Sequence, residues 1–159
     1  MGALPARRTA RQLRLRGVTE ADLDALALLD RETFPEEPYP YFVLRQMYDV
    51  YPDHLLVLDD GTELKGYVLV GTAPDKSRSW ILGLGITRDE RGQGYGRRLM
   101  DEALRRLRGI GVAEVLLTVV PTNTAAILLY ETLGFTAEQT TRQDYFGPGA
   151  DRLVMRLRL

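Results

Sequence analysis

A glycine-rich segment near the middle of the chain has the composition of an anion-binding turn. Residues 91–96 read Arg-Gly-Gln-Gly-Tyr-Gly and lie between an apolar run at 80–86 and a helical pattern that starts near Gly94. Unobstructed backbone N–H groups at a helix N-terminus bind an anion together with the helix dipole, and small residues let a pyrophosphate approach closely. Arg91 and Arg97 would add positive charge. The segment predicts a phosphate cradle, with an ordinary glycine-rich turn as the structural alternative.

Two other kinds of phosphate-binding loop disagree with this part of the sequence. A Walker loop requires Gly-Lys-Ser/Thr, but Gly96 is followed by Arg97 and Arg98. A Rossmann fingerprint would begin at Gly83, and Arg88 then occupies the position of its third glycine. The sequence therefore excludes a P-loop NTPase and disfavours dinucleotide binding.

Residues 91–96 resemble the pyrophosphate motif R/Q-x-x-G-x-G/A of the GNAT N-acetyltransferases. A second segment, residues 123–135, resembles the N-x-x-A-x-x-L-Y-x-x-x-G-F pattern of the same superfamily and follows in the expected order. The pattern is most similar to that of ribosomal-protein alanine and protein N-terminal acetyltransferases. The resemblance implies an α/β fold in a single domain, with a mixed, mostly antiparallel sheet of about seven strands and helices on both faces.

The resemblance also implies acetyl-CoA as the cofactor and assigns residues to it. Asn123 would touch the cofactor near its reactive end, and Tyr130 would donate a proton to the departing thiolate as general acid. Packing alone is the alternative for Tyr130. The expected cofactor-binding residues are Leu84, Gly85, Ile86, Arg91, Gly92, Gln93, Gly94, Tyr95, Gly96, Arg97, Asn123 and Tyr130.

The general base departs from the family pattern. In the ribosomal-protein alanine acetyltransferases a glutamate on the preceding strand serves as base, but Thr118 holds this position and cannot act as one. Glu36 and Glu37 in a proline-bounded loop become the candidate carboxylates, with Glu36 taken as catalytic. Solvated surface acids are the alternative interpretation. His54, the only histidine, is interpreted as a strand-end residue.

The acceptor is expected to be a primary amine. A peptide α-amine is about a tenth neutral at pH 7, whereas a lysine is neutral in well under about a thousandth of molecules, so a weak base penalises an N-terminal substrate less. Phe34-Pro35 resembles the Phe/Leu-Pro loop of protein N-terminal acetyltransferases, and residues 142–146 resemble their R/K-x-N-Y-Y turn. The expected substrate-binding residues are Phe34, Pro35, Glu36, Glu37, Thr118 and Tyr145.

Two other functions remain open from the sequence. One is acetylation of a small amine, such as a polyamine, an amino sugar or a drug. The other is an acetyl-CoA-binding sensor without catalysis, which Thr118 suggests. Asp144 and Phe146 also depart from the asparagine and the second tyrosine of the peptide-binding turn.

Apolar periodicity predicts the elements that position these residues. Amphipathic patterns indicate helices, whereas alternating or continuous apolar runs indicate strands. Three prolines break the chain between the first two helices. We divide the chain into a flexible basic tail at 1–11 and an acetyltransferase domain at 12–159. Strands are predicted at 13–18, 55–58, 67–70, 80–86, 115–120, 136–140 and 153–157, and helices at 21–29, 41–51, 97–109 and up to 133, the last capped by Thr122 or Asn123.

Composition limits the remaining function classes. A net charge of −1 gives no basic field for nucleic acid, although arginines crowd the first sixteen residues. The chain has no cysteine, so no disulfide, thiolate metal site or acetyl-cysteine intermediate is expected. Direct attack of the amine on the thioester in a ternary complex is therefore predicted. The absence of cysteine also agrees with a cytoplasmic location, which we predict. No apolar run has the length of a membrane helix. We expect no metal, and a monomer or homodimer.

Overall fold

The described chain folds into α-helices and mostly short β-strands. The computed structural model describes residues 12–159, so the predicted tail at 1–11 lies outside the described part. Four helices are α1 (Leu23–Thr33), α2 (Tyr41–Val50), α3 (Tyr95–Gly109) and α4 (Thr124–Thr132). The strands are β1 (Arg14–Gly17), β2 (Leu55–Asp59), β3 (Leu64–Thr72), β4 (Arg78–Ile86), β5 (Glu114–Val119), β6 (Thr136–Ala137) and β7 (Leu153–Arg158).

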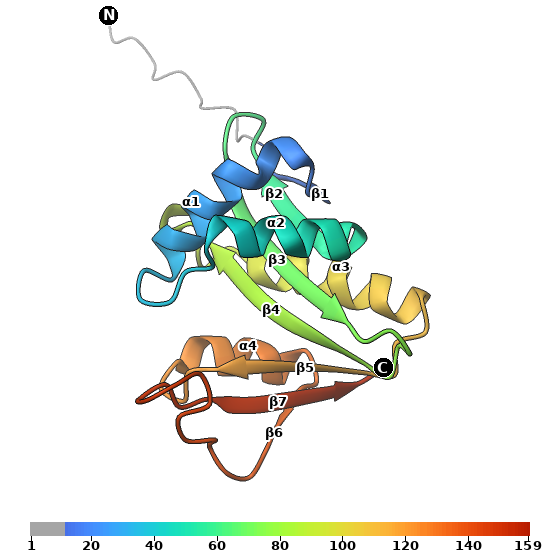
Figure 1. Cartoon of the computed structure of the whole chain (residues 1–159), viewed down its shortest axis with the longest axis vertical. Coiled ribbons are helices and arrows are strands. Elements are labelled where there is room, and N and C mark those ends of the chain that lie inside the picture. Colours follow the sequence, from blue (N-terminus) through green and yellow to red (C-terminus); the bar gives the residue numbers. More distant parts are fainter. Residues whose placement is uncertain (1–11) are drawn as a thin grey trace, which may run out of the picture.

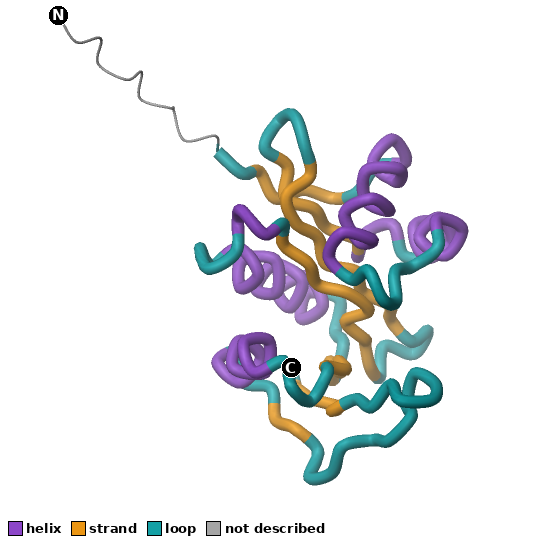
Figure 2. Tube along the Cα trace, turned by 90° about the vertical axis from the view of Figure 1, so that its left-hand side faces the viewer, coloured by secondary structure: helices purple, strands orange, loops and turns teal. Residues whose placement is uncertain are grey.

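One open sheet of seven strands separates the helices into two layers. Its order is β1-β2-β3-β4-β5-β7-β6, and only β4 and β5 run parallel. Helices α1 and α2 cover one face, and α3 and α4 cover the other (Figures 1 and 2). The predicted α/β class, with a mostly antiparallel sheet of seven strands and helices on both faces, is confirmed.

Each face of the sheet has its own apolar core. Successive side chains of a strand point to opposite faces. Leu55 and Val57 of β2 therefore join the core beneath α1 and α2, whereas Leu56 and Leu58 join the core beneath α3 and α4. All four are almost completely buried. The continuous apolar run of β2 is thus explained by burial on both sides.

Strands β4 and β5 separate part-way along their length. They pair in parallel from Arg78 and Glu114 as far as Ile81 and Leu117. Beyond that point β4 is paired only with β3, and β5 only with β7, so the two strands diverge (Figure 1). Among the described residues, no strand pairs with the edge of β4 that faces β5 at residues 82–86.

A β-bulge lies at the same point of β4. Leu69 pairs with Gly83, but the next residue of β3, Val70, pairs with Ile81. Leu82 is therefore an extra residue without a partner in β3. A bulge increases the local twist of a strand and re-aims its neighbours, and here it coincides with the separation from β5.

Several predicted boundaries are corrected by the structure. Helix α1 continues past 29 to Thr33 and ends at Phe34, because the residue before a proline disfavours the helical conformation. The strand predicted at 136–140 is shorter, since β6 ends at Ala137. His54 ends a short 3₁₀ turn just before β2, close to the predicted strand end.

Arg16, near the start of the described chain, is held by two acids and is not part of a free basic arm. Arg16 bonds Asp22 at 2.7 Å and Asp59 at 3.0 Å. These bonds join β1 to the turn that precedes α1 and to the end of β2. No helix within residues 12–159 is long and apolar enough to cross a membrane.

Candidate active site

The glycine-rich segment forms a left-handed turn between β4 and α3. Gly92 and Gly94 have φ of +76° and +83°, a conformation that other residues rarely adopt. Gly94 is the N-cap of α3, and no side chain within the described chain caps the helix. The first N–H groups of a helix have no intrahelical acceptor. Open backbone donors therefore follow the end of β4, as the sequence predicts.

Side chains brace this turn from both ends. Arg91 Nε donates to the carbonyl of Ile86 at 2.9 Å, which ties the turn to the last residue of β4. Arg97 Nη1 donates to Thr132 Oγ1 at 2.9 Å, which ties the start of α3 to the end of α4. Gln93 donates weakly to Asp89 O at 3.3 Å. These polar side chains shape the turn, and the backbone N–H groups are left for a ligand.

The open turn and the free strand edge fit the pyrophosphate and the pantetheine arm of an acetyl-CoA molecule. Nothing lies within 4 Å of the position that a Cβ would take on Gly92 or Gly94. Upstream, β4 offers unpaired backbone at Leu84 and Ile86. An extended amide chain can pair with such an edge, and a pyrophosphate can lie on the turn. The residues present thus fit the expected cofactor.

Gly85 has an additional reason to be glycine. A Cβ there would lie 2.6 Å from the ring of Tyr67 and 3.0 Å from the methyl group of Thr33. The close approach is on the α1 side of the sheet, so packing requires a glycine at this position.

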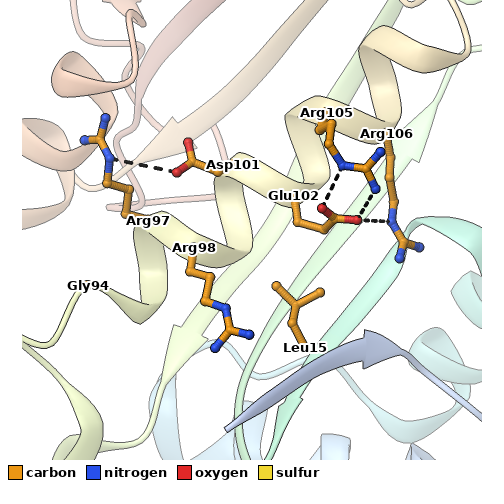
Figure 3. A pocket seen from close by; sticks show the side chains of 8 residues that line it. All are labelled: Leu15, Gly94, Arg97, Arg98, Asp101, Glu102, Arg105 and Arg106. Atoms are coloured by element: carbon orange, nitrogen blue, oxygen red, sulfur yellow. Dashed lines mark hydrogen bonds and ion pairs between the residues drawn. The ribbon is translucent and has the colours of Figure 1, made fainter.

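An open hollow of about 560 Å³ runs along the side of α3 (Figure 3). Most of its arginines are paired with acids, since Arg97 faces Asp101, while Glu102 accepts from Arg105 and Arg106. Tyr130 and the predicted acceptor loops do not line it, so it does not mark the point of acetyl transfer. Its lining residues are Leu15, Gly94, Arg97, Arg98, Asp101, Glu102, Arg105 and Arg106.

Tyr130 lies on the last turns of α4 and is 8% exposed. Its ring meets Phe135 edge-on with centroids 6.0 Å apart, and it belongs to the same core that Leu84 and Ile86 pack against. Its hydroxyl forms no hydrogen bond with residues 12–159. Burial raises the pKa of Tyr130 to about 12. The side chain is therefore a neutral hydrogen-bond donor at every physiological pH.

Thr118 and Asn123 lie at the two ends of the segment that leads from β5 to α4. Thr118 is half-buried and is the first residue of β5 after the separation from β4. Asn123 is the N-cap of α4, where its Oδ1 accepts from the N–H of Ala126 at 3.2 Å. The asparagine thus has a structural role in addition to the predicted contact with the cofactor.

The two loops predicted to border the acceptor are joined by an ion pair. Glu37, between α1 and α2, accepts from Arg152 Nη2 at 2.6 Å, although the residues are 115 positions apart. The Arg152 guanidinium also lies 4.9 Å from the centre of the Phe146 ring. Next to Phe146, Tyr145 stacks at a centroid distance of 5.2 Å. An aromatic and charged rim therefore connects the segments at 34–38 and 142–152.

The remaining predicted acceptor residues stay exposed on this rim. Phe34 is 40% exposed and ends α1, and Pro35 follows it at the surface. Glu36 is exposed and forms no hydrogen bond or ion pair within residues 12–159. Glu37 has its carboxylate engaged by Arg152, so Glu36 is the more available of the two acids.

The profile of the "Acetyltransferase (GNAT) family" matches residues 21–135, a range that includes both the turn at 91–96 and Tyr130. The chain belongs to this family. The family predicted from the two motifs is confirmed, and the predicted class of N-acetyltransferase agrees with it.

Relatives of the GNAT chain include proteins with different acceptors in their names. Mycothiol acetyltransferase of Geodermatophilus obscurus is 44% identical over 78 residues, which are 49% of this chain and only 21% of that protein. The chain thus spans about a fifth of that relative's length. N-alpha-acetyltransferase 30 of Schizosaccharomyces pombe is 30% identical over 102 residues, covering 62% of this chain and 68% of that protein.

The GNAT fold is also shared with solved structures. The NatC complex bound to Gag peptide and CoA contains a chain that matches with a TM-score of 0.83 and 21% identity, covering 93% of this chain and 99% of that chain. That complex is bound to CoA, which agrees with the predicted cofactor class.

Sequence reasoning about this GNAT site missed the residues that join its two loops to the sheet. Arg152 reads as one more exposed arginine, and Tyr39 as one of several aromatics near prolines. One signal was present for Asp30, because it falls on the buried face of α1 with Leu23, Leu26 and Leu29. An acid on the apolar side of a helix indicates a specific partner.

Proposed function

We propose that this chain is an acetyl-CoA-dependent N-acetyltransferase that acts on the α-amine of a protein or peptide. The carrying observation is the divergence of β4 from β5, which leads a free strand edge directly into the open turn at 91–96. Tyr130 is buried in the core that packs against that strand. Because the chain belongs to the GNAT acetyltransferases, we infer that this arrangement binds acetyl-CoA.

In this proposal the chain holds the cofactor mainly by its backbone. The edge at Leu84 and Ile86 pairs with the pantetheine arm, and the N–H groups from Gly92 to Gly96 hold the pyrophosphate. Bound acetyl-CoA supplies a thioester whose carbonyl carbon forms a bond to the amine nitrogen as the C–S bond breaks and the CoA thiol leaves. The chain has no cysteine, so direct transfer without a cysteine intermediate is the simplest route.

Tyr130 stabilises the departing sulfur as a hydrogen-bond donor. A thiol has a pKa of about 8.5, so full transfer of a proton from a phenol near 12 would be uphill by about 5 kcal/mol. A neutral donor in an apolar site still stabilises developing negative charge. Burial thus favours a role for Tyr130 as a hydrogen-bond donor that keeps its proton over a role as a full general acid.

The acceptor side supports an amine that needs little help to lose its proton. Thr118 supplies no base, and Glu36 is the exposed carboxylate of the rim without a partner in the described chain. An α-amine is about a tenth neutral at pH 7, so a solvent-linked carboxylate suffices to take up its proton. In this proposal Phe34, Pro35, Glu37 and Tyr145 border the extended peptide.

Acetylation of a small amine is the second candidate. The observation in its favour is the similarity to mycothiol acetyltransferase. The match covers about half of this chain. That protein is several times longer than the matched part, so the comparison concerns one domain of it.

The deciding experiment measures CoA thiol release from acetyl-CoA with two panels of acceptors. One panel holds short peptides with free N-termini, and the other holds polyamines, amino sugars and other small amines. Turnover restricted to peptides with a free α-amine supports the proposal, and N-terminally blocked versions of the same peptides serve as controls. Turnover only on small amines selects the second candidate. Tight binding of acetyl-CoA without release on any amine indicates a sensor and ends both.

A further inference from the structure

Asp30 is a buried carboxylate that the proposed reaction does not use. It lies in the last turn of α1 and is 1% exposed. One oxygen accepts from the backbone N–H of Tyr39 at 2.6 Å, and the other accepts from the hydroxyl of Tyr67 at 2.6 Å. No cation within residues 12–159 pairs with it. Burial and the nearby carboxylate raise the pKa of Tyr67, so its hydroxyl stays protonated and remains a donor.

Packing alone does not account for an acid at this position. A carboxylate loses its hydration on burial and is disfavoured near a helix C-terminus, where the dipole is negative. Its neighbours on the buried face of α1 are apolar, and it lies among a core that includes Leu26 and Leu29. An acid that violates the local preference is expected where a specific arrangement has to be held.

Asp30 holds both ends of the loop between α1 and α2. Its backbone carbonyl accepts from the N–H of Phe34 at 2.8 Å, where the loop begins. Its side chain accepts from the N–H of Tyr39, where the loop ends. The intervening residues are Pro35, Glu36, Glu37 and Pro38, three of which are predicted acceptor-binding residues. One residue thus closes the whole loop.

The same network connects the loop to the separation point of the sheet. The hydroxyl of Tyr39 donates to the carbonyl of Leu82 at 2.7 Å. Leu82 is the bulge residue of β4 and has no partner residue in β3. The loop therefore rests on β4 at the point where its edge becomes free for the cofactor.

We propose that Asp30 is a positioning residue for the acceptor amine, acting through the loop at 34–38 and through Tyr39. This inference rests on the proposed function, because it assigns the loop to the acceptor. The network fixes the position of the loop on β4, and hence the surface that binds the acceptor amine. The network contacts no residue of the turn at 91–96, so we expect it to leave the affinity for the cofactor unchanged.

Two conservative substitutions test the network. Asp30→Asn keeps the shape of the side chain but removes the charge and one acceptor, whereas Tyr39→Phe removes only the hydroxyl that reaches Leu82. We expect the KM for the acceptor to rise about 10-fold in Asp30→Asn and about 3-fold in Tyr39→Phe. The kcat and the Kd for acetyl-CoA should stay within about twofold. Tyr48→Phe on α2, which also loses one hydroxyl, is the matched control and should match the unmodified chain.

Hydrogen–deuterium exchange gives a second readout that needs no substrate. The amides of Glu36, Glu37 and Tyr39 should exchange faster in both variants and remain unchanged in Tyr48→Phe. Unchanged exchange in the loop overturns the proposal, as does an unchanged acceptor KM or a loss confined to kcat. A parallel loss of acetyl-CoA affinity and thermal stability would assign Asp30 to general folding and also overturn it. If the unmodified chain acetylates no amine, the proposed function falls, and loop exchange alone decides whether the network orders the loop.

Discussion

The proposed cofactor side and the proposed acceptor side of this site are built in different ways. On the cofactor side, backbone groups of one contiguous stretch, residues 82–96, provide the free edge and the open turn, and Arg91 closes the turn onto Ile86 only five positions away. On the acceptor side, side chains join distant segments, as Glu37 does with Arg152 and Tyr39 with Leu82. Backbone recognition requires little more than glycine and a helix N-terminus, whereas side-chain recognition depends on contacts that only the complete fold provides.

The difference predicts distinct consequences of substitution. Changes on the cofactor side should act through backbone conformation and cofactor affinity. Changes on the acceptor side should each remove one weak contact and should raise the acceptor KM modestly.

The largest effect is expected for Gly94→Val. Because φ is +83° there, a β-branched residue would force the turn to rearrange, and the N–H groups at the start of α3 would move. We expect the affinity for acetyl-CoA to fall about 100-fold or more, measured by isothermal titration calorimetry.

Gly111→Val is the matched control for backbone strain. Gly111 also has a φ of +82° and nothing within 4 Å of its Cβ position, but it lies after α3, away from the turn. Both variants should lose about 1–2 kcal/mol of unfolding free energy, and only Gly94→Val should lose cofactor affinity. Equal losses of affinity would show that strain anywhere near α3 is sufficient.

The next effect concerns Tyr130, the proposed hydrogen-bond donor to the departing sulfur. Tyr130→Phe retains the ring contact with Phe135 and removes only the donor. We expect kcat to fall about 10- to 100-fold while the Kd for acetyl-CoA stays within about twofold. Steady-state kinetics and calorimetry measure the two values. An unchanged kcat would leave Tyr130 with a packing role alone.

A smaller effect is expected for the ion pair across the acceptor rim. Glu37 is about half exposed at its side chain, and exposed pairs contribute only about 0.2–1 kcal/mol. Glu37→Gln and Arg152→Met should each raise the acceptor KM about 2- to 5-fold, and added salt should reduce the difference from the unmodified chain.

Arg156→Met is the matched control for the rim. Arg156 lies on β7, the strand that begins directly after Arg152. It pairs with Glu114 and Glu138, away from the loop at 34–38. Its acceptor KM should be unchanged. A double-mutant cycle without coupling between Glu37 and Arg152 would contradict a joint role for them.

The smallest effect is expected from alkaline pH. Burial raises the pKa of Tyr130 to about 12, so its donor form is retained as pH rises and is lost only above that value. The rate should increase as the acceptor amine loses its proton, and kcat should then change by less than about twofold between pH 8 and 10. A decline of kcat with an apparent pKa near 9 to 10 would contradict the burial of Tyr130.

Much of the fold was predictable from local sequence. The apolar runs at 80–86 and 115–120 locate β4 and β5, and the glycines of 91–96 locate the turn before α3, because these features depend on neighbouring residues alone. The boundaries that were wrong depend on distant contacts. Helix α1 extends to Thr33 with Leu29 and Asp30 buried against the sheet, and β6 is limited by its pairing with β7.

The sequence by itself determined the family, the glycine turn before α3 and the position of Tyr130 on its helix. These properties reside in residue types and short spacings, which act through local backbone conformation. Only the tertiary structure decided that β4 leaves β5 at Ile81, that Glu37 meets Arg152, and that Asp30 closes the loop beside Tyr39. Such contacts join residues far apart in the chain, and burial then sets the strength of each polar group, as it does for the hydroxyl of Tyr130.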